Sequence, residues 1–144
     1  MKKYQLPQMD HVFSIQAVGE ETGINWVGDF TYRRPTLWER SQIDVMRARL
    51  NGDMTTLDQN VATFNEAIAH LRYTLKESPE WWKEADAGGA LYDANIVSII
   101  YNKCMEFEKK WLEKLYSGKA EAVEANKNEV QDDKRQVTSV SGAK

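Results

Sequence analysis

Two segments near the N-terminus alternate between apolar and polar residues with the two-residue period of β-strands. They are residues 11–18 and 24–32, and a turn-forming run from Gly19 to Gly23 separates them. The side chains that share the apolar face are Phe13, Ile15 and Ala17 in the first segment and Ile24, Trp26, Phe30 and Tyr32 in the second. This pattern predicts a β-hairpin. Because an isolated hairpin is only marginally stable in water, we expect it to pack on helices or on another subunit.

Gly28 also falls on the apolar face of the second segment. A glycine inside a strand has no side chain, so a backbone or an aromatic ring can approach it closely. We therefore expect a tight contact at Gly28.

From residue 36 onward the apolar residues follow the three- and four-residue steps of amphipathic helices. The predicted helices are residues 36–50, residues 56–77, a short helix between residue 78 and Gly88-Gly89, and residues 91–116. The most regular apolar stripe, on the second helix, consists of Leu57, Val61, Phe64, Ile68, Leu71 and Leu75. The predicted fold class is therefore α+β and mainly helical, with an N-terminal β-hairpin packed on a small bundle of amphipathic helices.

Two short motifs mark the predicted helix starts. Thr36 and Glu39 have the spacing of a capping box, in which each side chain bonds to the backbone amide of the other residue. Ser78 followed by Pro79 predicts an N-cap and a first helical residue, because proline is tolerated at the first position of a helix.

The composition changes after Gly118. Residues 119–144 contain no aromatic residue and no Leu, Ile or Met, and a segment of such low hydrophobicity cannot offset the entropy of ordering. We therefore predict an N-terminal arm at residues 1–10, a single folded domain at residues 11–118 and a polar, mobile C-terminal tail at residues 119–144.

The composition also disfavours several classes of protein. A chain of 144 residues is long enough for one domain with its own core. Its single cysteine, Cys104, cannot form an internal disulfide, so we expect a buried thiol and a reducing compartment. No secretory signal or membrane span is apparent. The net charge of −3 offers no basic face, so nucleic acid is not an expected partner.

No combination of residues has the spacing of a catalytic or metal site. His11 and His70 lack a spaced Cys, His or acidic partner. Glu108 and its acidic neighbours lie among lysines, as on a solvated helix face. An enzyme would require a pocket that gathers residues distant in sequence, such as His70 with Asp58 and Tyr92. We therefore predict that the protein is not an enzyme and has no catalytic residue, cofactor or metal.

Arg33 and Arg34 open the main basic concentration of the chain. Three interpretations stay open. The arginines contact an anion or nucleic acid, they form ion pairs along the first helix, or they belong to an assembly interface, where arginine is enriched. The acidic residues available for ion pairs are Asp29, Glu39 and Asp44.

The tryptophans are the most suggestive group for binding. Trp81 and Trp82 are adjacent on a helix, where neighbouring side chains point about 100° apart, so they can hardly both face one core. The exposed member of the pair would be an anchor for a partner. The candidate partner-binding residues are Trp81, Trp82, Trp26, Phe30, Arg33 and Arg34.

Three features together resemble a known family: the strand end Trp26–Phe30, the arginine–proline break followed by Thr36 and Glu39, and the element Pro79–Trp82 between two amphipathic helices. This order of elements over residues 11–116 is similar to the tail assembly chaperones of long-tailed bacteriophages. In that family the helical domain binds the tape-measure protein and keeps its hydrophobic helices soluble until the tail tube assembles. The C-terminal tail can be replaced or extended by a translational frameshift.

The resemblance implies a non-enzymatic bacteriophage assembly protein of the host cytoplasm that binds phage tail or other virion proteins, with self-association as a further expectation and no membrane partner. The expected surfaces are the open edge or apolar face of the hairpin and the Trp81/Trp82 region. One alternative is a structural component of the virion, such as a neck, connector or capsid accessory protein, which an ordered tail would favour. The other is a small inhibitor or adaptor of a host protein.

Overall fold

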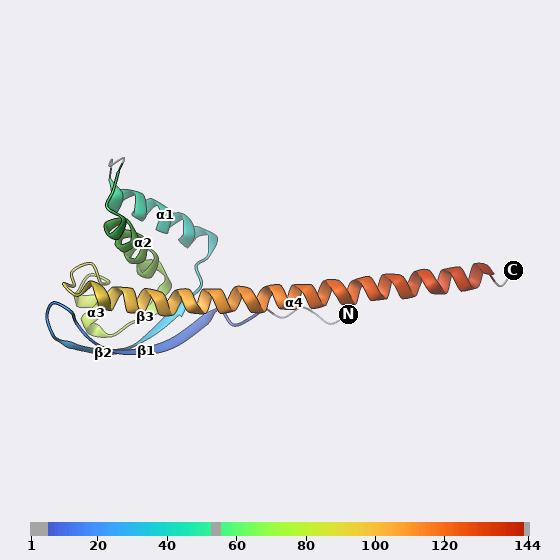
Figure 1. Cartoon of the computed structure of the whole chain (residues 1–144), viewed down its shortest axis with the longest axis horizontal. Helices are drawn as coiled ribbons and strands as arrows, with labels where there is room; N and C mark the ends of the chain where they lie inside the picture. The colour runs from blue at the N-terminus through green and yellow to red at the C-terminus, as the bar shows by residue number, and fades with distance from the viewer. Residues whose placement is uncertain (1–5, 53–55, 143–144) are drawn as a thin grey trace. The chain divides into compact units, whose positions relative to one another are not determined.

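The computed structural model describes residues 6–52 and 56–142, with the side chains in these ranges except 121–123 and 125–142. The elements follow in the order β1 (Asp10–Val18), β2 (Asn25–Arg33), α1 (Leu37–Asn51), α2 (Gln59–Thr74), β3 (Leu75–Glu77), α3 (Glu80–Glu84) and α4 (Ala94–Gly142) (Figure 1). The predicted α+β fold class, with an N-terminal hairpin and mainly helical content, is confirmed.

The chain consists of two units, each described by itself. The larger unit, Gln8–Glu108, contains the sheet, α1 to α3 and the first turns of α4. Among the described residues, the smaller unit comprises those up to Pro7 and those from Lys109 onward. Within the smaller unit, the indole Nε1 of Trp111 donates a hydrogen bond to the backbone oxygen of Pro7 at 3.3 Å.

The hairpin has the predicted strands, to within one residue at their ends. β1 and β2 pair antiparallel without interruption, from Asp10 opposite Arg33 to Val18 opposite Asn25. A third strand, β3, pairs antiparallel with the other side of β2, so the strand order is β1-β2-β3. The central strand of the sheet is therefore β2, and β1 lies at one edge.

The predicted helix over residues 56–77 is wrong at its C-terminal end, because α2 stops at Thr74 and the next three residues form β3. Leu75 is extended, with φ −81° and ψ 106°, and it lies opposite Tyr32 of β2. Leu75 continues the apolar stripe of the helix, so periodicity alone could not separate the two states. The backbone bonds available along β2 decide in favour of the strand.

The predicted start of α3 is also wrong. Pro79, not Ser78, occupies the N-cap position, and no side chain caps this helix. Because β3 continues to Glu77, Ser78 and Pro79 are used to turn the chain from strand to helix. By contrast, the capping box of α1 is confirmed, with Thr36 Oγ1 and Glu39 Oε1 each 3.2 Å from the backbone nitrogen of the other residue.

The core of the larger unit lies between the inner face of the sheet and the helices. The sheet contributes Phe13, Ile15, Phe30 and Tyr32, and the helices contribute Ala67, Ile68, Leu71, Trp82, Ile96, Val97, Ile100 and Cys104. The expectation that the hairpin packs on the helices is therefore confirmed. Cys104 is fully buried, as predicted, and this burial raises the pKa of its thiol to about 12.

Gly28 makes the close contact that its position predicts. A Cβ atom at Gly28 would lie 2.5 Å from Cγ of Pro79 and 3.3 Å from Nε1 of Trp81. Any side chain at this position would therefore displace the segment that leads into α3.

Helix α4 continues to Gly142, through the segment predicted as a polar tail. The predicted mobility of residues 119–144, and the predicted boundaries at residues 10 and 118, stay predictions. None of the helices in the described ranges combines the length and the apolar composition that a membrane span needs.

Candidate functional site

Of the predicted Trp81/Trp82 pair, the structure places Trp82 in the core and Trp81, partly exposed, against it. Trp82 is only 2% exposed, and its ring meets the fully buried ring of Phe30 edge-on at 5.7 Å. Trp81 is half-buried, and its indole Nε1 donates to the backbone oxygen of Val27 at 2.9 Å. Phe30 and Trp82 therefore stabilise the core, and neither can be the exposed anchor of a partner-binding surface.

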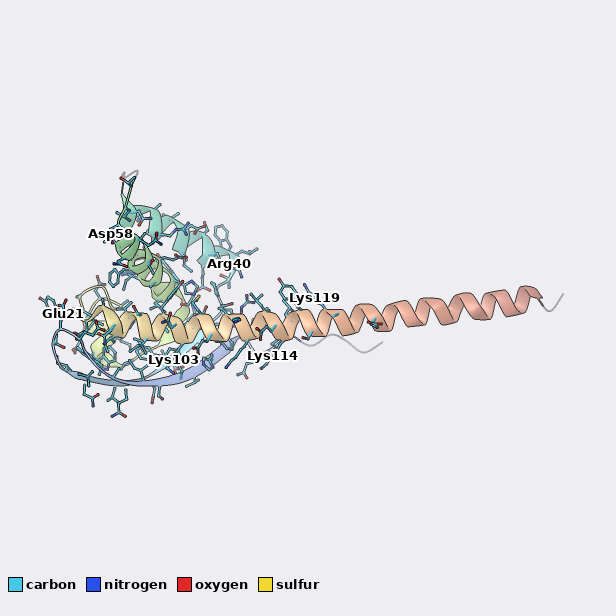
Figure 2. The ribbon with its side chains drawn as sticks, in the orientation of Figure 1. Glu21, Arg40, Asp58, Lys103, Lys114 and Lys119 are labelled. Carbon is cyan, nitrogen blue, oxygen red and sulfur yellow. The ribbon has the colours of Figure 1, made fainter. Side chains whose placement is uncertain are left out.

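Trp26 belongs to a cluster around a buried carboxylate at the start of α4. Asp93 accepts hydrogen bonds from the backbone amides of Glu21 and Thr22, each at 2.9 Å, from the Thr22 hydroxyl and from Nε1 of Trp26 at 2.9 Å. Figure 2 labels Glu21 at the tip of the hairpin. Gly19 makes room for this cluster, since a Cβ there would lie 2.0 Å from Oδ2 of Asp93.

These donors control the titration of Asp93. The Thr22 hydrogen bond, followed by the bonds from the Thr22 amide, Trp26 and the Glu21 amide, lowers the pKa of Asp93 to about 2, against the opposing effect of burial. Because every donor is neutral, the carboxylate keeps its charge without a cation among the groups that bond it. This cluster joins the tip of the hairpin to α4 and serves the fold.

The two candidate arginines make different ion pairs. Arg33 meets Asp10 at 3.5 Å on the surface, whereas Nε of Arg34 meets Oε2 of Glu108 at 2.7 Å. The side chains of Arg34 and Glu108 are only 13% and 16% exposed. Of the three acidic residues proposed as partners for arginines, only Asp44 has one among the ion pairs of the described residues, Arg47 at 3.2 Å.

Glu108 is also the centre of a second polar cluster. The Tyr32 hydroxyl donates to Oε1 of Glu108 at 2.7 Å and lies 2.9 Å from Nε2 of His70. A hydroxyl has only one hydrogen, and Tyr32 donates that hydrogen to Glu108. In the second hydrogen bond the Tyr32 oxygen must therefore accept, and His70 must donate. The geometry therefore assigns the neutral His70 ring its proton on Nε2 and leaves Nδ1 as the acceptor.

Burial shifts both titrating groups of this cluster toward their neutral forms. It lowers the pKa of His70, although the charge of Glu108 acts in the opposite direction. It also raises the pKa of Tyr32 far above its usual range, and the hydrogen bond to Glu108 adds to that effect. Tyr32 and His70 therefore both act as neutral hydrogen-bonding groups near neutral pH.

A cavity of about 370 Å3 opens beside this cluster, between α1, α2 and α4. Its lining comprises Pro35, Arg40, Ile43, Asp44, Arg47, Glu66, His70, Met105 and Glu108. The charges along it are mixed, with two arginines from α1 facing carboxylates from all three helices. Such a lining does not select one sign of charge in a ligand.

The catalytic grouping considered from the sequence is not formed. Asp58 caps the N-terminus of α2, where it accepts from the amide of Asn60 at 2.9 Å (Figure 2). Tyr92 is 78% exposed. His70, near the other end of α2, meets Tyr32 instead of either residue. No group of three or more His, Cys, Asp or Glu side chains that could hold a metal lies within the described ranges.

The most exposed large apolar side chains lie at the start of α1, and sequence reasoning missed them as a binding surface. Trp38 is 83% exposed and Leu37 is 81% exposed. Val45, seven residues after Trp38 and therefore on the same side of the helix, is also exposed. The opposite side of α1 carries Ile43, which is buried. We call Leu37, Trp38 and Val45 the α1 patch.

The pattern of α1 contained a signal for this patch. Once Ile43, Met46 and Leu50 are assigned to the inner stripe, Leu37, Trp38 and Val45 are left on the other side of the helix. A helix with a second apolar side has more apolar surface than its own fold covers.

Comparisons with protein-family models, with curated proteins and with solved structures find no match to this chain.

Proposed function

We propose that this chain is a non-enzymatic bacteriophage assembly protein that acts by binding another protein through the α1 patch. The observation that carries the proposal is the exposure of Trp38 and Leu37 at the first turn of a well-anchored helix. Tryptophan is the residue type most enriched among the side chains that dominate protein–protein binding energy. An exposed Trp38 beside an exposed leucine fits that role.

The start of α1 is held in place before any partner binds. The capping box of Thr36 and Glu39 defines the first turn, and Glu39 also pairs with Lys76 of β3. Because the helix is fixed at both its backbone and its side chains, little conformational entropy is lost when a partner covers Trp38. Such preorganisation increases affinity.

The occupant proposed for the α1 patch is an apolar helix of a phage tail or other virion protein. The α1 patch presents apolar groups at helical spacing, which suits packing against a second amphipathic helix. The assignment to bacteriophage assembly in the host cytoplasm rests on the resemblance of residues 11–116 to tail assembly chaperones. On this proposal, the protein covers the apolar helix until its partner assembles.

The test is an affinity capture of the tagged full chain from infected-cell lysate, read by mass spectrometry, with two matched variants. Trp38→Ala removes the centre of the α1 patch, and Tyr92→Ala removes an equally exposed aromatic residue from the segment before α4. Because both side chains are exposed, neither variant is expected to change the melting temperature measurably. We expect the parent and Tyr92→Ala to recover the same phage virion protein, and Trp38→Ala to lose most of it.

Two results would contradict the proposal. Equal recovery of the virion protein by all three chains would reject the α1 patch as the binding site. Recovery of one host protein and no virion protein would reject assembly and favour the inhibitor or adaptor. If the virion protein is recovered and this chain is also present in purified particles, it is a structural component and not a chaperone that leaves.

A further inference from the structure

β1 is a long edge strand whose outer side lies open except at Val18, where Asn95 bonds to the backbone oxygen. It has nine residues, it pairs with β2 without a bulge, and no strand lies on its other side in the described part of the chain. The other edge of the sheet, β3, has only three residues. An open edge presents unpaired amide and carbonyl groups, which makes it a template for another strand.

The register shows which backbone groups of β1 point outward. The amide of Arg34 donates to the oxygen of Met9 at 3.2 Å, and the amide of Gly19 donates to the oxygen of Ile24 at 2.8 Å. These bonds continue the β1–β2 register at its two ends, and they place odd-numbered residues of β1 in the hydrogen-bonded pairs. Because such pairs alternate along an antiparallel ladder, the even-numbered residues direct their amides and carbonyls away from β2.

A separate contact supports this assignment. The backbone oxygen of Val18 accepts a hydrogen bond from the side-chain amide of Asn95, so an even-numbered carbonyl does face away from β2. The other outward-facing residues of β1 are Asp10, Val12, Ser14 and Gln16, and all four are exposed.

The usual protection of an edge strand is absent from β1. Edge strands normally carry lysine, proline or a bulge that prevents pairing with another chain. Residues 10–18 contain no lysine, arginine or proline, and the only charged side chain is Asp10 at one end. Val12 is 69% exposed at the open edge. The sequence of β1 is therefore suited to pairing rather than to its prevention.

We propose that β1 pairs antiparallel with β1 of a second copy of this chain, about a two-fold axis through Ser14. The outward-facing residues are spaced symmetrically about Ser14, so this register pairs Val12, Ser14 and Gln16 of both copies, while the carbonyl of Val18 keeps its bond to Asn95. Val12 then lies opposite Gln16 of the second copy, and Ser14 lies opposite its own counterpart. The result is a continuous six-stranded sheet with the helices of both copies on its inner face.

The single charge of β1 is compatible with a second copy as the occupant and favours the antiparallel direction. Antiparallel pairing places the two Asp10 carboxylates at opposite ends of the paired strands, each beside Val18 of the other copy. Parallel pairing would bring the two carboxylates to the same end. Like charges facing each other across strands are destabilising, so the antiparallel arrangement is preferred. The inference uses β1 alone and does not depend on the α1 patch.

The first test is the oligomeric state of the full chain by sedimentation velocity over a range of concentrations. The parent should form a dimer. Gln16→Pro removes an outward-facing amide and leaves the β1–β2 ladder intact, because proline is tolerated on an edge strand. The variant loses two symmetric hydrogen bonds from the dimer, so its dissociation constant should rise by roughly tenfold or more. A parent that stays monomeric at every concentration would overturn the inference.

The second test uses cysteine cross-linking, because the only native cysteine, Cys104, is fully buried. In the proposed register the two Ser14 Cα atoms are about 5.5 Å apart, within the range of a disulfide. Ser14→Cys should therefore give a covalent dimer under mild oxidation. The control Gln16→Cys places its two thiols about 13 Å apart along the strands and should not cross-link.

These variants also separate an edge contact from a face contact. Val27 lies opposite Gln16 on the central strand, and it is exposed on the same face of the sheet. Val27→Lys should leave an edge-paired dimer unchanged. A dimer that Val27→Lys dissociates and Gln16→Pro does not, or equal cross-linking of the two cysteine variants, would overturn the proposed pairing.

Discussion

Asp93, just before α4, and Glu108, within α4, are both largely buried carboxylates, yet the protein stabilises them in different ways. Asp93, just before α4, is bonded by neutral donors from the hairpin turn and from Trp26. Glu108, within α4, is bonded by the cation of Arg34 and by the Tyr32 hydroxyl. Neutral dipoles can thus replace a cation as the partner of a buried charge, provided that enough of them converge.

The two clusters also differ in their access to solvent. Asp93 has no exposed surface. Glu108 and His70 line a cavity of about 370 Å3 together with Arg40 and Glu66. A substitution at Asp93 therefore removes the acceptor of four hydrogen bonds, from two backbone amides, the Thr22 hydroxyl and the Trp26 indole. The hydrogen bonds described for Glu108 come from Tyr32 and Arg34. We expect the same kind of change to cost more stability at Asp93.

The largest loss of stability is expected from Asp93→Ala. The change leaves the amides of Glu21 and Thr22 and the indole nitrogen of Trp26 without their acceptor, and each lost hydrogen bond to a charged group destabilises the fold. The melting temperature, measured by calorimetry, should fall by roughly 15 °C. The control is Asp86→Asn, an exposed position with φ 51° that asparagine adopts readily, and it should melt within about 2 °C of the parent. Equal melting of the two variants would show that the Asp93 cluster is not structural.

A smaller fall in melting temperature is expected from Glu108→Gln. The amide oxygen can still accept from Tyr32, but Arg34 loses the anion that balances its mostly buried charge. We expect a decrease in melting temperature of about 8 °C. Adding Arg34→Met should restore part of that loss, because it removes the cation whose charge Glu108 balances. If the double variant is as unstable as the sum of both single changes, the two side chains do not act as a pair.

Dependence of stability on pH should separate the clusters further. The folded-state pKa of Asp93, about 2, lies below its ordinary value of 3.8, so its contribution to stability is present above pH 3.8 and is lost as the pH falls toward 2. The folded-state pKa of His70 also lies below its ordinary value of 6.5. Below pH 6.5 the unfolded chain therefore binds a proton that the folded chain does not, and stability falls.

His70→Gln provides the matched variant, because its amide can still donate to the Tyr32 oxygen. Urea denaturation from pH 7.5 down to pH 5 should show a smaller loss of unfolding free energy in His70→Gln than in the parent. An identical loss in both chains would mean that His70 has the same pKa in the folded and unfolded states.

Much of the fold could be predicted from local pattern. The alternation of residues 11–18 and 24–32 predicted the hairpin, the spacing of Thr36 and Glu39 predicted the start of α1, and Gly28 predicted a close contact. The errors fell where two elements meet. Residues 75–77 continue a helical stripe, but they become β3 because β2 offers them backbone partners.

The polar clusters around Asp93 and Glu108 were harder to predict, because their groups are far apart in sequence. Tyr32 and Glu108 are 76 residues apart, and Asp93 and Trp26 are 67 residues apart. Glu108 does follow Cys104 by four residues, so it lies on the buried stripe of α4, but its lysine neighbours suggested a solvated face. The pattern of α1 does place Trp38 opposite the stripe of Ile43, but it could not show that Trp81 is the less exposed of the two tryptophans.

By itself, the sequence determined the hairpin and the main helices of this protein, because strand and helix periods, capping residues and glycines act over a few neighbouring positions. Only the tertiary structure decided which tryptophan is exposed, which carboxylates are buried and which strand is left at an edge. Those properties depend on contacts between distant segments, and burial and electrostatic stabilisation arise only when these segments meet.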